Sequence, residues 1–144
     1  MKRPELLLPA GNIEKMLYAL HYGADAVYLG TSDFSLRNTN QGEIITRENL
    51  AKAVKLAHEL NKKVYITINI YAHNKDIKVL PEYIEYLTDI KPDAIIFSDI
   101  GVGTLIKRHS KNIPLHLSTQ ANTCNYATAE AWYDFGVERI ILAR

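Results

Sequence analysis

The sequence has a single cysteine, Cys124, no long apolar run and almost no excess of charge of either sign. One cysteine can form neither an internal disulfide nor a thiolate cage for zinc, which argues against a secreted, disulfide-stabilised fold. No apolar run approaches the roughly 20 residues that span a bilayer, and the first nine residues are too short for a signal peptide. We therefore expect a cytoplasmic protein with no membrane partner.

Several functional motifs are also missing. The chain contains no G-x-x-x-x-G-K-[ST], H-E-x-x-H or C-x-x-C string, and its first turn, PAGN from Pro9, lacks the glycine-rich dinucleotide fingerprint. We therefore expect no metal or cofactor within these residues. The 17 basic and 16 acidic residues give a net charge of +1, which neither indicates nor excludes an RNA partner.

What the sequence does contain is an alternation of short apolar runs with segments of helical periodicity. Asn12 and Thr46 are predicted to cap the first two helices, and Pro81 is predicted in the first turn of the third. Gly23 and Gly136 stand where a helix reverses, a turn that requires a left-handed residue. The strands are predicted at Leu6–Leu8, Ala26–Leu29, Val64–Ile70, Ala94–Phe97, Leu115–Leu117 and Arg139–Leu142.

Strand parity favours a closed barrel over an open sheet. Val64 and Ile66 share one face of the third strand, whereas Thr67 and Asn69 share the other. On the fifth strand, the polar face carries His116, Ser118 and Gln120. An open sheet covered by helices on both faces would bury such polar side chains against apolar stripes, but a barrel interior can accommodate them. The fold class predicted is α/β: a partial (β/α) TIM-type barrel of about six parallel strand-helix units, unclosed.

A complete barrel needs about eight strands and 250 residues, more than this chain supplies. We therefore expect residues 1–144 to be the amino-terminal part of a barrel domain in a longer protein. An unpaired strand edge would invite self-association or pairing with the rest of that protein. The isolated piece is expected to be inactive.

Polar residues at the carboxyl ends of the strands are the candidate site, because barrel enzymes place their active sites there. Asp99 is the candidate general base, with capping of the next helix as the alternative. For Cys124, inert burial is favoured over thiolate reactivity at a helix start. The predicted substrate-binding residues, each with a purely structural role as the alternative, are Arg37, Asn69, His116, Ser118, Gln120 and Arg144.

Six strings together resemble one family. They are ELLLPAGN, YGADAVYLG, FSLRN, NKKVYITINIYAHN, SDIGV and HLSTQANTCN, and they extend from Glu5 across essentially the whole chain. The sequence resembles the collagenase-like peptidase family, which is peptidase family U, number thirty-two. The resemblance implies that this is the amino-terminal barrel part, and that the family's Glu and His-Gly signature and the cysteines holding an iron-sulfur cluster in some relatives fall beyond Arg144.

The resemblance implies more than one function. The main hypothesis is that the parent protein is an enzyme, a protease acting on peptide bonds, as in collagen degradation. The first alternative is an iron-sulfur-dependent component of tRNA or ribosomal RNA base hydroxylation, and the second is a non-catalytic assembly domain. The residues themselves include no nucleophile paired with a base, which weakens the protease hypothesis.

Overall fold

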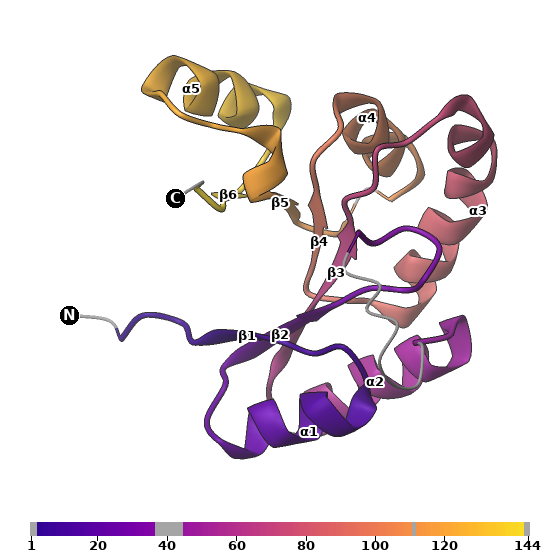
Figure 1. Cartoon of the computed structure of the whole chain (residues 1–144), viewed down its shortest axis with the longest axis vertical. Coiled ribbons are helices and arrows are strands. Elements are labelled where there is room, and N and C mark those ends of the chain that lie inside the picture. Colours follow the sequence, from indigo (N-terminus) through magenta and orange to yellow (C-terminus); the bar gives the residue numbers. More distant parts are fainter. Residues whose placement is uncertain (1–2, 37–44, 111, 143–144) are drawn as a thin grey trace. The chain divides into compact units, whose positions relative to one another are not determined.

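The computed structural model describes residues 3–36, 45–110 and 112–142 (Figure 1). The chain divides into two compact units, Met1–Thr67 and Ile68–Arg144. In the described residues strands and α-helices alternate along the chain, with one short 3₁₀ helix inserted before the last α-helix. Of the described helices, none is both long and apolar enough to cross a membrane.

The first unit is built from three parallel strands and two helices. Its elements are β1 (Leu7–Pro9), α1 (Ile13–His21), β2 (Ala26–Leu29), α2 (Arg47–Glu59) and β3 (Lys63–Ile68), the last residue of which opens the second unit. Strand β2 pairs with both β1 and β3, for example Val27 with Leu8 and with Val64. Helices α1 and α2 lie on the same side of β1 and β2 (Figure 1).

The two predicted caps of this unit are confirmed. Asn12 Oδ1 accepts a hydrogen bond from Lys15 N at 2.8 Å, and Thr46 Oγ1 accepts one from Asn49 N at 3.2 Å. Each cap satisfies an amide that the first helical turn leaves without a partner. Behind the caps, each helix turns an apolar stripe inward, which buries Met16, Leu20, Leu50, Ala53, Val54 and Ala57.

The second unit continues the same alternation. Its elements are α3 (Asn74–Ile90), β4 (Ala94–Phe97), α4 (Ile100–His109), β5 (Leu115–Leu117), the 3₁₀ helix η1 (Thr119–Ala121), α5 (Tyr126–Phe135) and β6 (Arg139–Ile140). Strand β5 pairs in parallel with β4 and with β6, for example His116 with Ile96 and with Arg139. Helices α3 and α4 pack side by side.

An aromatic cluster links strand β4 to helix α5. The Phe97 ring meets the Trp132 ring edge-on, with centroids 5.8 Å apart, and Phe135 lies 6.3 Å from Phe97. A side chain at Gly103 of α4 would bring its Cβ within 2.5 Å of Phe97 Cε2. Glycine at this position therefore lets the helix backbone approach the cluster.

Strand order supports the barrel prediction. The order follows the chain from β1 to β6 without reversal, whereas a doubly wound sheet changes direction partway across. Since crossovers between parallel strands are right-handed, an unreversed order puts the connecting helices of each unit on one face of its strands, as in a (β/α) barrel. The prediction of a partial, TIM-type barrel is confirmed.

The prediction for the third helix is wrong at its start. Helix α3 begins at Asn74, so Pro81 lies in its interior and not in its first turn. The start is fixed by Asp76, whose carboxylate accepts a hydrogen bond from His73 N at 2.8 Å. His73 is therefore the N-cap residue. The sequence pattern was misread because an interior proline normally ends a helix.

Other boundaries shift by small amounts. Strand β1 lies one residue later than predicted, β3 ends at Ile68, and β6 ends at Ile140. The two helix-reversing glycines are confirmed, with φ of 100° at Gly23 and 103° at Gly136.

Candidate functional site

Four neutral polar residues gather in the second unit where its strands end. Asn69 follows β3 in the chain, Ser98 follows β4, and Ser118 and Gln120 follow β5. We call these four residues the amide cluster. Because the carboxyl ends of parallel strands lie at one edge of a sheet, this is where a barrel enzyme builds its site.

Hydrogen bonds join the amide cluster through Gln120. Its Oε1 accepts one bond from Asn69 Nδ2 at 2.8 Å and another from Ser118 Oγ at 2.9 Å. Ser98 Oγ donates to the backbone oxygen of Asn69 at 3.5 Å. Three strand ends are thereby tied together by side chains that carry no charge.

A short turn brings Gln120 back over the end of β5. Ser118 is the N-cap of η1, and its Oγ accepts a hydrogen bond from Gln120 N at 3.5 Å. The turn closes at Asn122, whose φ of 54° is left-handed, a conformation that asparagine tolerates better than most residues. The backbone thus folds the Gln120 side chain toward Asn69.

The residues of the amide cluster differ in their exposure to solvent. Asn69 is 4% exposed and Ser118 is 7% exposed, whereas Gln120 is exposed. Burying amides and hydroxyls is favourable only when they are hydrogen-bonded, as they are here. The exposed Gln120 is the member of the cluster that a ligand can reach.

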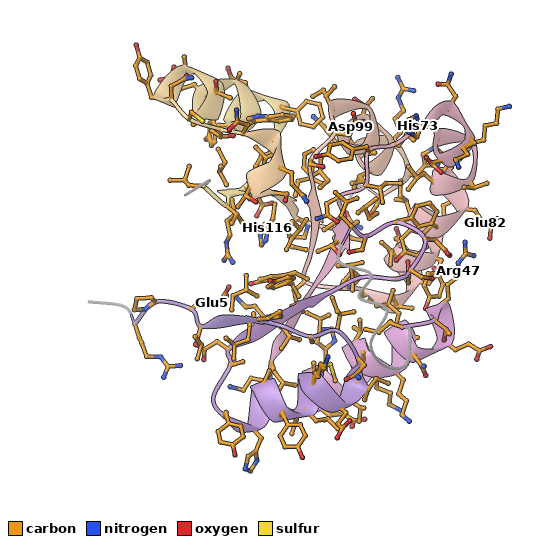
Figure 2. All side chains as sticks on the ribbon, in the orientation of Figure 1. Glu5, Arg47, His73, Glu82, Asp99 and His116 are labelled. Atoms are coloured by element: carbon orange, nitrogen blue, oxygen red, sulfur yellow. The ribbon has the colours of Figure 1, made fainter. Side chains whose placement is uncertain are left out.

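His116 lies deeper on β5, two residues before Ser118, and is labelled in Figure 2. Residues two apart on a strand point to the same face, so His116 and Ser118 share the polar face that the sequence predicts. His116 is 6% exposed. A substrate-binding role for it stays a prediction.

Asp99 occupies the position of a helix cap. Its Oδ1 accepts a hydrogen bond from Val102 N at 2.9 Å, which makes it the N-cap of α4. Figure 2 shows Asp99 and His73 labelled at the starts of α4 and α3. Among the hydrogen bonds of the described residues, none joins the Asp99 side chain to the amide cluster. The general-base role for Asp99 stays a prediction beside this observed cap.

Arg37 and Arg144, two of the predicted substrate-binding residues, lie outside the described residues. The preference for inert burial of Cys124 is wrong, because its side chain is exposed. Cys124 precedes the N-cap of α5, and its Sγ donates to Asn122 Oδ1 at 3.2 Å.

Sequence reasoning missed a second polar contact, which lies in the first unit. Thr67 Oγ1 donates to Ser35 Oγ at 2.8 Å and lies 3.3 Å from Leu29 O, and both hydroxyl side chains are buried. A Cβ at Gly30 would collide with Thr67 Oγ1 and come within 2.6 Å of Ser35 Cβ. A glycine directly after a buried strand was the available signal for this close approach.

The amino ends of the first unit's strands carry charges instead. Asp25 accepts hydrogen bonds from Leu6 N at 2.9 Å and from the Arg3 guanidinium at 2.6 Å. Glu5 binds Lys63 Nζ at 3.1 Å and the Tyr65 hydroxyl at 2.8 Å. The amide of Leu6, followed by the charges of Arg3 and Lys62, lowers the pKa of Asp25 from its ordinary value.

Metal ligation was not expected from the sequence. Within residues 3–36, 45–110 and 112–142, the structure brings together no group of three His, Cys, Asp or Glu side chains that could hold an ion. The amide cluster is the best-formed site among the described residues, and its groups can bind and orient a ligand by hydrogen bonds.

The fold and the sequence together place the chain in a family. The sequence model of peptidase family U32 matches residues 11–144, so the chain belongs to that family. A solved structure of a U32 peptidase superimposes with a TM-score of 0.71 at 12% identity, covering 99% of this chain and 59% of that one. The family prediction is confirmed.

Relatives of known name refine this picture. The chain is 49% identical over its whole length to tRNA hydroxylation protein P of Helicobacter pylori and 43% identical to that of Escherichia coli. It spans about a third of each relative, 34% and 31% of their lengths. A collagenase of Porphyromonas gingivalis is 30% identical over 140 residues and is matched over 33% of its length.

These identities correct the main functional hypothesis. Five relatives named for tRNA hydroxylation are 39% to 49% identical over nearly the entire chain, above the 30% of the collagenase. The prediction of a protease as the main function is therefore wrong. It relied on the family's name, whereas the residues themselves gave no nucleophile paired with a base.

Proposed function

We propose that this chain is the amino-terminal barrel part of a protein that takes part in hydroxylating tRNA. The observation that carries the proposal is the 39% to 49% identity, over nearly all of the chain, to relatives named for tRNA hydroxylation. Since the chain spans about a third of such a relative, the activity belongs to the whole protein. Because tRNA is its proposed substrate, we also place the protein in the cytoplasm.

The amide cluster supports a role in binding RNA bases. Proteins read single-stranded RNA largely through hydrogen bonds to base edges, and amide side chains supply both donors and acceptors for this purpose. Asn69, Ser118 and Gln120 are neutral, so they can recognise a base edge without attracting a proton or a metal ion. In this proposal the cluster orients the base.

Nucleoside analysis tests the proposed function directly. Deleting the gene, in a strain that lacks any second relative, should remove one hydroxylated nucleoside from digested tRNA, as measured by mass spectrometry. The full-length gene should restore it. Ribosomal RNA nucleosides from the same cells are the control, and the proposal predicts that they do not change.

Two outcomes would contradict the proposal. A full set of tRNA nucleosides in the deletion strain would remove tRNA hydroxylation as the function. Loss of a hydroxylated nucleoside from ribosomal RNA alone would show that the substrate is ribosomal RNA and not tRNA.

A further inference from the structure

The side-chain oxygen of Gln120 already accepts as many hydrogen bonds as it has lone pairs. Its carbonyl oxygen has two lone pairs, and it accepts two hydrogen bonds, from Asn69 Nδ2 at 2.8 Å and from Ser118 Oγ at 2.9 Å. Both donors belong to buried side chains. The oxygen of Gln120 is therefore committed to the protein.

The other end of the same amide is available. Nε2 carries two N–H donors, and it makes no hydrogen bond within the part of the chain that the structure describes. Gln120 as a whole is exposed. A ligand that reaches this residue thus meets donors and not an acceptor.

The neighbours hold the amide in this orientation. If the Gln120 amide rotated by half a turn, its NH2 group would face the NH2 group of Asn69, and the donors would repel. The Ser118 hydroxyl is positioned by the Gln120 N–H, which lies 3.5 Å from its oxygen, and it directs its single proton to Oε1. Asn69 and Ser118 therefore determine the polarity that Gln120 presents.

Such a donor selects ligands by polarity. A neutral NH2 group suits a neutral carbonyl oxygen, whereas a phosphate is recognised mainly by cationic groups, and the amide cluster contains none. Uracil, guanine and cytosine carry carbonyl oxygens on their edges, but adenine does not. On the basis of the proposed function, we propose that Gln120 donates a hydrogen bond to a carbonyl oxygen of the bound base, with Asn69 and Ser118 as its positioning residues.

Two substitutions in the full-length protein reverse this polarity without changing side-chain size. In Gln120→Glu, one carboxylate oxygen keeps the bonds from Asn69 and Ser118, and the other presents an acceptor to the ligand. In Asn69→Asp, a carboxylate faces Gln120 and attracts Nε2, so the unchanged Gln120 presents its oxygen outward. Thr119→Val, on the neighbouring exposed residue, is the matched control.

The readout is a ratio of affinities. Isothermal titration with uridine and adenosine should show uridine binding weakened roughly ten-fold or more in both variants, with adenosine binding unchanged. The control should bind both nucleosides as the wild type does. The melting temperatures of Gln120→Glu and Thr119→Val should stay within about 3 °C of the wild type. That of Asn69→Asp should fall further, because its carboxylate stands at a buried position.

The variants are also tested by complementation of the deletion strain. Full-length wild type and Thr119→Val should restore the hydroxylated nucleoside, and the two polarity variants should not. If wild type restores it and both variants do so equally well, the inference fails while the proposed function stands. If wild type does not restore it but the uridine ratio changes as expected, the proposed function fails and the inference stands.

Two binding results would overturn the inference. One is an equal change of uridine and adenosine affinity in Gln120→Glu, which would show that the substitution acts without regard to the carbonyl oxygen. The other is that inorganic phosphate displaces uridine from the wild type but not from Gln120→Glu, which would show that the Gln120 amide binds phosphate.

Discussion

The strands of the first unit begin among charged side chains, whereas the strands of the second unit end among neutral ones. Asp25 and Glu5 are bound by Arg3 and Lys63 in partly exposed pairs, with side-chain exposures between 22% and 76%. In the amide cluster, Asn69 is almost completely buried. The first unit therefore holds ion pairs that stay hydrated, whereas the second unit buries neutral groups that are hydrogen-bonded to each other.

Physical chemistry explains why the two networks differ. Removing a charge from water costs several kcal/mol even when it is paired, so ion pairs remain at the surface, where each contributes little. Amides and hydroxyls can be buried when each finds a partner, and the low dielectric then strengthens their hydrogen bonds. The ion pairs at the charged amino ends therefore each add little to stability, whereas the neutral carboxyl ends are suited to oriented recognition.

The largest loss of stability is expected from adding a side chain at Gly30, where the carboxyl ends of the first unit's strands are closely packed. Gly30→Ala places a methyl group against Thr67 Oγ1 and within 2.6 Å of Ser35 Cβ, and should cost about 1–3 kcal/mol or more through overpacking. Urea unfolding of the full-length protein measures this. The control is Gly101→Ala, whose Cβ would approach only Asp99 Oδ1, at 3.0 Å. Equal stability of the two variants would contradict the close packing at Gly30.

A medium effect is expected from removing one buried hydroxyl. Thr67→Val keeps the shape of the side chain but deletes the donor to Ser35 Oγ, and should cost about 1–2 kcal/mol because buried acceptors lose a partner. Thr104→Val is the matched control, since Thr104 Oγ1 donates to Ile100 O on an exposed helix surface. If the two substitutions lowered the urea midpoint equally, burial would not be the decisive difference.

The smallest effect is expected at the charged end, and it should depend on pH. The pKa of Asp25 is lowered in the folded state, mainly by the Leu6 amide, so the ionised carboxylate stabilises the fold. That contribution is present above the ordinary pKa of 3.8 and is lost as the pH falls below it. Asp25→Asn should therefore flatten the acid side of the stability profile, measured as thermal midpoint against pH. Parallel profiles for wild type and variant would contradict the assigned role of Asp25.

The fold was predictable from local signals. The caps at Asn12 and Thr46, the glycines at helix ends and the apolar strand cores act within a few residues of each other, so the sequence displays them openly. The start of α3 was not predictable in this way, because Pro81 signals a beginning while the contact between His73 and Asp76 sets it earlier. The signal from the proline was therefore outweighed by the hydrogen bond between His73 N and the Asp76 carboxylate.

The candidate site was predictable only as a set of positions. Strand parity put Asn69 and Ser118 on a common polar face, and the structure shows both buried. Parity could not show that Gln120 receives both of their hydrogen bonds, nor that Asp99 caps α4. Side-chain bonds between residues 51 positions apart depend on how the strands are packed.

The sequence by itself determined the order of strands and helices, the family and the polar faces, because each depends on neighbouring residues or on periodicity along the chain. Only the tertiary structure decided which polar groups meet, which of them leave water, and which end of the Gln120 amide remains available to a ligand. Those properties arise from distances across the fold, and no spacing along the chain encodes them.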